Sequence, residues 1–355
     1  MNLKEDHLDG KKLMMVVYSL QSENVLFAHQ KTIVEKLANE FPNVFVLSIY
    51  DEVENSVASS TIPTLGCGWR SKSKIGRVVS FVYFFLRQMW SFKPDIVFYH
   101  MTDTHCALVS PLSRFFKAKQ VLWYAHTSKS LALKISYLFI DNIITSTRGS
   151  CPVVGKKVIT VGQSVDSDKF KFQPRFRGYR SGVSIGRLDE SKRIPYIVKE
   201  FDELVKRGVI SKIHFFGEPS NDVEKEKWIS VEEKLLSESP WFSQSLRGKL
   251  QHSEIPARLT EYDFFVHAFQ GSLDKTLIEA TLLGIPVITI NSEYLNEFGN
   301  WPACTFKSTL LEQFLAICSL NSEGMKQLLL LRRNLAVQKH GVDQWVKKVK
   351  ECLET

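Results

Sequence analysis

The residues of this chain that are best suited to chemistry lie just after position 270. A polar segment led by Gly271 passes directly into apolar residues with helical spacing, which end at Gly284 before a short β-branched strand. The first N–H groups of such a helix have no partner within the helix and carry a partial positive charge. With the side chain of Lys275, they form a site suited to an anion such as a diphosphate. One acid, Glu279, stands among the apolar residues of the predicted helix.

Two further cations follow a predicted strand upstream. That strand ends at Gly186, and Arg187 and Lys192 follow five residues apart; the next predicted strand ends at Gly217. Glycine lets the backbone approach a ligand closely, and guanidinium and ammonium groups bind phosphate oxygens. Open α/β sheets bind ligands at the carboxyl ends of their strands, so these residues are candidates for one phosphate site. The alternative is a surface loop with ordinary charges.

The elements that must position these residues follow from the pattern of apolar residues. Short apolar runs alternate with helical spacing in both halves, which predicts an α/β fold with parallel sheets covered on both faces. Strands are predicted over residues 13–19, 44–49, 95–100, 120–125, 142–146, 182–185, 213–216, 264–267 and 287–290. Helices are predicted over residues 28–41, 72–92, 194–207, 255–260, 275–283 and beyond 342.

The same pattern predicts how the chain is divided. At 355 residues the chain exceeds one ordinary core, so two domains are expected. We predict an N-terminal domain over residues 1–165, a linker over 166–181 and a C-terminal domain over 182–340. A terminal helix over 341–355 is predicted to pack back on the N-terminal domain.

Composition places the chain among globular proteins. It is 44% hydrophobic and 24% charged, no apolar run approaches the roughly 20 residues of a membrane span, and the start resembles no signal peptide. The six cysteines are scattered, which favours free thiols over a zinc site or a disulfide framework. We therefore expect a cytoplasmic protein, without a metal or another cofactor.

The net charge of +8 is concentrated in one region. Residues 61–160 hold fourteen Lys and Arg against three Asp, a net charge of +11. No nucleic-acid motif accompanies them, so nucleic acid is not expected as a partner. The predicted helix over 72–92 mixes basic and apolar residues, which indicates either peripheral contact with an anionic membrane or a core helix with a solvated basic face.

The order of motifs over residues 181–295 resembles the nucleotide-binding half of the family 4 retaining glycosyltransferases (glycosyl transferases group 1). Five elements occur in that order, namely Gly-Arg-x4-Lys, strand-Gly, Gly-x-Leu-x3-Glu-Ile-Pro, Tyr-Asp-Phe-Phe-Val and Leu-Ile-Glu-Ala-x3-Gly-Ile-Pro-Val. The resemblance implies the GT-B fold, in which two Rossmann-like domains with parallel sheets face each other across a cleft. It implies that the N-terminal domain is the acceptor side and that the C-terminal domain binds the nucleotide sugar. More weakly, residues 157–170 resemble the family's segment at the domain junction.

The resemblance also implies roles for single residues. Arg187 and Lys192 would bind the donor diphosphate, and Glu279 would bind the donor ribose. His126, at a strand end, would face the transferred sugar, with a structural role as the alternative. A structural role is also expected of His100 and His105. The predicted catalytic residues are His126, Arg187 and Lys192. The predicted donor-binding residues are Gly186, Arg187, Lys192, Gly217, Gly271, Ser272, Leu273, Asp274, Lys275, Thr276 and Glu279.

Two positions depart from the family pattern. Gly271 stands where relatives carry an acid that contacts the donor sugar, so either Asp274 or backbone N–H groups take over that contact. Residues 19–24 replace the Gly-Gly loop that usually follows the first strand.

The resemblance implies a retaining, metal-independent glycosyltransferase. Its donor would be a nucleotide-diphosphate sugar, linked to UDP or GDP, and its acceptor a saccharide or lipid-linked hydroxyl in cell-surface polysaccharide or lipopolysaccharide synthesis. The alternatives are a non-catalytic subunit that binds a sugar nucleotide and a GT-B-fold epimerase that acts on one.

Overall fold

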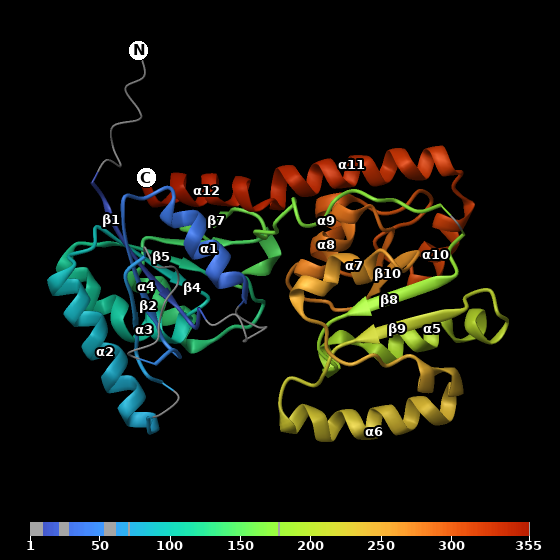
Figure 1. Cartoon of the computed structure of the whole chain (residues 1–355), viewed down its shortest axis with the longest axis horizontal. Helices are drawn as coiled ribbons and strands as arrows, with labels where there is room; N and C mark the ends of the chain where they lie inside the picture. Colours follow the sequence, from blue (N-terminus) through green and yellow to red (C-terminus); the bar gives the residue numbers. More distant parts are fainter. Residues whose placement is uncertain (1–9, 21–27, 53–61, 70–71, 177, 355) are drawn as a thin grey trace, which may run out of the picture. The chain divides into compact units, whose positions relative to one another are not determined.

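The chain divides into two compact units in the computed structural model, which describes residues 10–20, 28–52, 62–69, 72–176 and 178–354. The N-terminal unit comprises residues 1–164 and 342–355, and the C-terminal unit comprises residues 165–341. Figure 1 labels the elements of both units and colours them along the chain.

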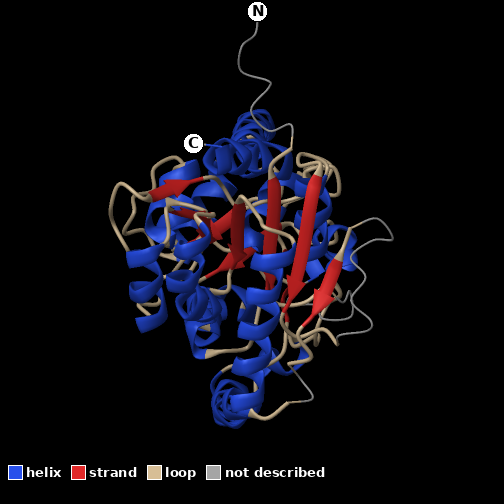
Figure 2. Cartoon of the chain, turned by 90° about the vertical axis from the view of Figure 1, so that its left-hand side faces the viewer, coloured by secondary structure: helices blue, strands red, loops and turns tan. Residues whose placement is uncertain are grey.

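The N-terminal unit is built on a seven-stranded sheet in the order β3-β2-β1-β4-β5-β6-β7, in which all neighbours are parallel. Figure 2 shows strands of this sheet side by side among helices. Its strands are β1 (Lys12–Val17), β2 (Asn43–Ser48), β3 (Thr64–Gly66), β4 (Ile96–His100), β5 (Lys119–Trp123), β6 (Asn142–Thr145) and β7 (Val158–Thr160).

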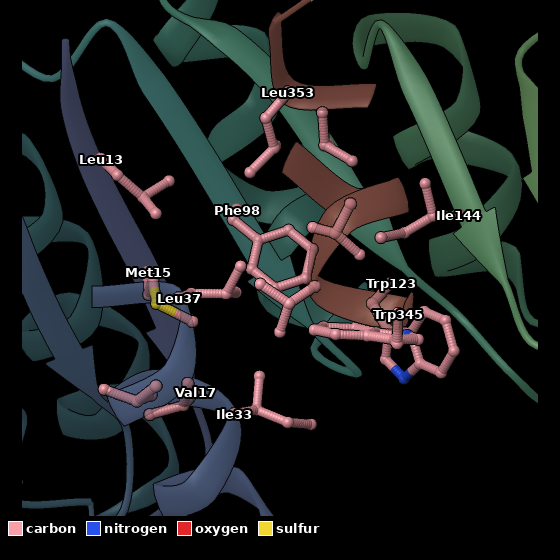
Figure 3. Close-up of a cluster of buried hydrophobic side chains, with 14 of the residues drawn as sticks. Leu13, Met15, Val17, Ile33, Leu37, Phe98, Trp123, Ile144, Trp345 and Leu353 are labelled. Carbon is pink, nitrogen blue, oxygen red and sulfur yellow. The ribbon is translucent and has the colours of Figure 1, made fainter. Parts of the chain in front are cut away.

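Alternate residues of β1 point to opposite faces of this sheet. Met15 joins a core with the helices α1 (Ala28–Ala38) and α12 (Val342–Glu354), whereas Met14 joins a core with α2 (Lys74–Ser91), α3 (Asp103–Ser113) and α4 (Leu131–Phe139). In the first core the ring of Trp345 from α12 packs edge-on against Trp123, with 5.4 Å between ring centroids (Figure 3). This buried tryptophan fixes the last helix of the chain on the N-terminal unit.

The C-terminal unit has a four-stranded parallel sheet in the order β11-β10-β8-β9. Its strands are β8 (Ser181–Ile185), β9 (Lys212–Phe216), β10 (Phe264–His267) and β11 (Val287–Thr289). One core involves α7 (Ile255–Leu259), α8 (Lys275–Leu283), α9 (Ser292–Phe298) and α11 (Ser322–His340). The other involves α5 (Ile194–Lys206), α6 (Asp222–Glu238) and α10 (Leu310–Ser319).

The predicted α/β class with parallel sheets is confirmed. The structure adds elements that the apolar pattern did not predict, including β3, β7, α6, α10 and α11. The segment before β8 contains neither a helix nor a strand among its described residues, yet it packs onto the C-terminal unit. Phe170 is fully buried there, and the N–H of Gln173 donates to the carbonyl of Leu283 at 2.8 Å.

Candidate functional site

Two strand ends of the C-terminal sheet approach each other closely. The N–H of Gly186 donates to the carbonyl of Phe216 at 2.9 Å, and a Cβ atom placed on Gly217 would lie only 1.7 Å from the carbonyl oxygen of Gly186. Position 217 therefore requires glycine. A Cβ atom on Gly186 would lie 3.3 Å from Cε of Lys192, so this glycine lets the lysine side chain fold back over the strand end.

Lys192 is largely buried and its ammonium group is already paired. It contacts the carboxylate of Asp274 and lies 4.5 Å from the ring centroid of Phe269. Nε2 of His267 lies 3.2 Å from the same carboxylate oxygen of Asp274. The Lys192–Asp274 ion pair therefore lies beside the ring of Phe269 and the imidazole of His267 at the carboxyl edge of the sheet.

The protonation states in this cluster follow from its burial. Burial lowers the pKa of His267, against the opposing effect of Asp274, so the imidazole is neutral and donates its Nε2–H to that carboxylate. Burial raises the pKa of Asp274, but the ammonium of Lys192 and the hydrogen bond from His267 outweigh it and hold that pKa well below its usual range. The resting cluster therefore contains one full ion pair.

Arg187 is the more accessible of the two predicted diphosphate-binding cations. Its side chain is 54% exposed, and its Nη1 lies 3.3 Å from the carboxylate of Asp189. That carboxylate also accepts a hydrogen bond from the N–H of Ser220 at 3.1 Å. Arg187 and Lys192 thus both carry an acidic partner, but only the pair formed by Lys192 is shielded from water.

The place of the expected acid at Gly271 is taken by an aromatic ring. A Cβ atom on Gly271 would lie 2.2 Å from the ring of Phe269, so this conformation of the loop excludes a side chain there. The loop is held by Asn291, whose buried Nδ2 donates to the carbonyls of Phe269 at 3.0 Å and Ser272 at 3.2 Å.

Helix α8 begins at this loop with polar groups that lack partners. Within the described chain, the buried hydroxyl of Thr276 and the buried Oε2 of Glu279 accept or donate no hydrogen bond. Glu279 is 2% exposed, and its Oε1 lies 3.2 Å from Nε2 of His252. Unpaired buried oxygens are costly, so they indicate a polar ligand at this helix end.

Lys275 is the first residue of α8. Burial lowers the pKa of its ammonium group to about 8, although Glu279 opposes the shift. Both the helix dipole and burial disfavour a cation here, so the position of Lys275 is not explained by stability. An anion bound at the helix end would reverse that penalty.

The predicted donor-binding residues converge on the carboxyl edge of the C-terminal sheet. They follow β8, β9 and β10, or lie on α8 directly after the β10 loop. Sequence reasoning missed His252, His267, Phe269 and Asn291, which support them. Asp274, considered as a substitute for the acid missing at Gly271, contacts Lys192 and His267.

The N-terminal unit holds the other predicted site residue. His126 is exposed, three residues after β5, with its ring edge-on to Tyr124 at 5.9 Å between centroids. His100 and His105 are buried. Part of the loop that replaces the Gly-Gly motif lies outside the described residues; at its start, the hydroxyl of Ser19 donates to buried Asp51 at 2.6 Å.

Solved structures with the same architecture identify the fold. The chain is similar to a glycosyltransferase from Rickettsia africae (TM-score 0.73, 13% identity, covering 97% of this chain and 98% of that one). It is similar to HepE of Anabaena in complex with UDP (TM-score 0.72, 12% identity, covering 96% and 99%), a protein also solved with UDP-glucose. It is similar to the lipopolysaccharide outer core galactosyltransferase WaaB (TM-score 0.65, 13% identity, covering 96% and 99%).

The chain therefore has the GT-B fold. At 12–13% identity these likenesses establish the fold alone. No protein-family model matches the sequence, and no curated protein does.

The described residues offer neither a metal cluster nor a membrane-spanning helix. They contain no group of three or more His, Cys, Asp or Glu side chains placed to hold a metal ion. No helix among them is both long enough and apolar enough to cross a membrane.

Proposed function

We propose that the protein is a glycosyltransferase that moves a sugar from a nucleotide-diphosphate donor to a hydroxyl group of a saccharide or glycolipid. The observation that carries the proposal is the start of α8, where the buried Oε2 of Glu279 and the hydroxyl of Thr276 have no partner in the described chain. The cations of Lys275 and Lys192 lie at the same helix end and loop. A nucleoside diphosphate supplies ribose hydroxyls for the carboxylate and an anion for the cations.

The residues of the site would act on the leaving group. In the transfer, the bond between the sugar C1 and the diphosphate oxygen breaks, and its electron pair leaves with the diphosphate. The acceptor oxygen bonds to C1, and its proton passes to the departing phosphate. Arg187, Lys192, Lys275 and the first N–H groups of α8 would stabilise the charge that develops on the leaving oxygen. These groups would do the work of a metal ion, so we propose a metal-independent reaction.

The finer features of the proposal rest on the resemblance to family 4. They are retention of anomeric configuration, a UDP- or GDP-linked donor and a sugar-facing role for His126. HepE, a protein with the same fold, has been solved with UDP and with UDP-glucose, which supports a nucleotide sugar as donor. WaaB, a galactosyltransferase of the lipopolysaccharide outer core, supports a saccharide or lipid-linked acceptor.

The role of Glu279 can be tested with paired nucleotides. Calorimetry would compare UDP and GDP with their 2′,3′-dideoxy analogues on the wild-type protein and on Glu279→Gln. We expect Glu279→Gln to weaken binding of the ribonucleotide about tenfold and to leave the dideoxy analogue unchanged. Glu233→Gln, an exposed carboxylate on α6, is the matched control. Equal loss for both nucleotides, or none for either, would contradict the assignment.

Product analysis separates the proposal from its two alternatives. Incubation of sugar nucleotides with a broad acceptor panel should give a glycosylated product. Binding without transfer or hydrolysis would identify a non-catalytic subunit. An epimer formed in the absence of any acceptor would identify an epimerase.

We also propose that the N-terminal unit contacts an anionic membrane through α2. Five large apolar side chains of this helix are exposed, namely Ile75 (79%), Val78 (41%), Val79 (61%), Tyr83 (58%) and Trp90 (75%). The cations of Lys74 and Arg87 are exposed on the same helix. Two cations of the basic region, Lys72 and Lys157, are instead only half-exposed, because each donates to a backbone carbonyl. The exposed mixture on α2 is the kind that binds the interface of anionic lipid.

A further inference from the structure

A cavity of the C-terminal unit contains none of the residues assigned to the donor. It has a volume of about 360 Å³ and lies between the first turn of α5, the first half of α6 and the segment that joins β8 to α5. Its apolar walls are formed by Leu188, Pro195, Tyr196, Trp228 and Val231. Small molecules bind in cavities of about this volume with mainly apolar walls.

The segment that joins β8 to α5 contributes to two different places. Arg187 and Lys192 belong to the proposed donor site, whereas their neighbours Leu188 and Arg193 line the cavity. A ligand in the cavity therefore rests on the same segment as the donor cations, but it uses other side chains. This division makes the cavity a candidate for a second site.

Two donors on the wall of the cavity have no acceptor in the described part of the chain. Trp228 is only 7% exposed, yet its indole N–H makes no hydrogen bond there. The guanidinium of Arg193 lies over the ring of Tyr196, 4.8 Å from its centroid, and pairs with no carboxylate among the same residues. The φ of Arg193 is 52°, a conformation that costs a non-glycine residue energy, so stability does not explain an arginine here. Acceptor oxygens would satisfy both donors.

Two of the three acids that line the cavity are already paired. The carboxylate of Asp189 lies 3.3 Å from Nη1 of Arg187. The carboxylate of Glu224 lies 2.7 Å from Nζ of Lys227. The third acid, Glu190, is exposed to solvent. The unmet groups within the cavity are therefore donors, which favours a ligand that brings acceptors.

We infer that this cavity binds a small carboxylate with an aromatic body, such as an aryl acetate. Its carboxylate accepts hydrogen bonds from the guanidinium of Arg193 and the indole N–H of Trp228, and its ring packs among Leu188, Tyr196 and Val231. The first turn of α5 lies at the same wall, and the dipole of that helix favours a negative charge there. The inference stands apart from the proposed function, because none of these residues is assigned to transfer.

The test compares a carboxylate with its amide. Indole-3-acetate and indole-3-acetamide share one aromatic body, and both would be titrated against the full chain by ligand-observed NMR. The wild type should bind the carboxylate with a Kd of about a millimolar or below, about tenfold more tightly than the amide. Arg193→Asn should abolish that preference, because asparagine tolerates a positive φ but brings no charge. Arg207→Gln, which removes an exposed arginine just beyond the end of α5, is the matched control and should keep the preference.

A second variant tests the other donor. Trp228→Phe keeps an aromatic ring and removes the N–H, so it should weaken binding of the carboxylate about fivefold while the protein stays folded. Saturating UDP or GDP should leave the carboxylate bound, whereas displacement would place it on the donor cations and overturn the inference. The inference also fails if the wild type binds carboxylate and amide equally, if the preference survives in Arg193→Asn, or if Trp228→Phe binds as the wild type does. Failure of UDP and GDP to bind would count against the proposed function alone, because the comparison of carboxylate with amide uses no nucleotide.

Discussion

Both units have a parallel sheet, but the side chains in the loops at the carboxyl edges of the two sheets differ. At the C-terminal sheet, the loops present cations that are already paired with acids, as in the contact of Lys192 with Asp274. At the N-terminal sheet, the corresponding loops present aromatic rings and neutral groups such as His105 and Thr102, whose polar atoms lack partners in the described residues.

This difference shows how one α/β scaffold can hold two kinds of site. Parallel strands bring consecutive loops to one edge in both units, and the loop residues decide what that edge binds. A charged site needs counter-ions when it is empty, because an isolated buried charge is expensive. Neutral polar groups need no counter-ion, only hydrogen-bond partners.

The largest effect is expected from removing the cations of the charged edge. Arg187→Ala and Lys192→Ala should each lower turnover by about 2–4 kcal/mol of transition-state stabilisation, roughly 30- to 1000-fold. The two should differ in stability, because Lys192→Ala leaves Asp274 buried without its partner, whereas Arg187 is half exposed. Steady-state kinetics and thermal unfolding measure both quantities.

An exposed cation away from the carboxyl edge of the sheet supplies the control for this pair. Lys225→Ala, an exposed cation on α6, should leave kinetics and stability as they are. Near-normal turnover in both Arg187→Ala and Lys192→Ala would remove the basis for the diphosphate site.

A smaller and opposite effect is expected from Asp274→Asn. Asp274 contacts Lys192 at the position proposed for a donor phosphate, and its negative charge would repel a diphosphate. The amide keeps the shape and removes the charge, so affinity for UDP or GDP should rise by about 1–2 kcal/mol, roughly five- to thirtyfold. Calorimetry shows whether Asp274→Asn raises or lowers the affinity for the nucleotide. Weaker binding would mean that Asp274 chiefly positions Lys192.

The local parts of this site could be predicted from the sequence, and the long-range parts could not. Arg187 and Lys192 directly follow a strand, so their place at the carboxyl edge is fixed by the chain itself. The partner of Lys192 lies 82 residues away, and nothing local indicates that Asp274 reaches it. The absent acid at Gly271 was visible, but its physical reason, the ring of Phe269, needs three-dimensional packing.

The same distinction applies to the fold. Buried strands are visible in the sequence as short apolar runs, so the alternation of strands and helices could be predicted. In α11, four consecutive leucines at 328–331 hide the helical period, and Leu330 and Leu331 stay partly exposed. In α6, only Trp228 and Leu235 are buried, which leaves too few apolar positions to show a face.

Nucleotide affinity should also depend on pH through Lys275. Its pKa is about 8 rather than 10.5, and a diphosphate binds the protonated form. Affinity for UDP or GDP should therefore fall about tenfold from pH 7 to pH 9. Unfolding does not explain this loss, because a lowered lysine pKa makes the folded state more stable as pH rises from about 8 to 10.5.

A variant without the Lys275 ammonium group isolates this effect. Lys275→Gln should bind the nucleotide more weakly at pH 7 and lose the decline towards pH 9. An equal decline in Lys275→Gln would assign the titration to another group.

The smallest effect is expected at α2, where the N-terminal unit carries exposed cations among exposed apolar side chains. Arg87→Gln should weaken binding to vesicles of mixed anionic and neutral lipid by about 1 kcal/mol, roughly fivefold, because each cation near an anionic surface contributes about that much. Arg207→Gln, an exposed arginine of the C-terminal unit, should have no effect. Co-sedimentation at two salt concentrations measures both, since the contribution of Arg87 should shrink as salt screens it. Equal binding to neutral and anionic vesicles would show that the basic residues of α2 serve solubility alone.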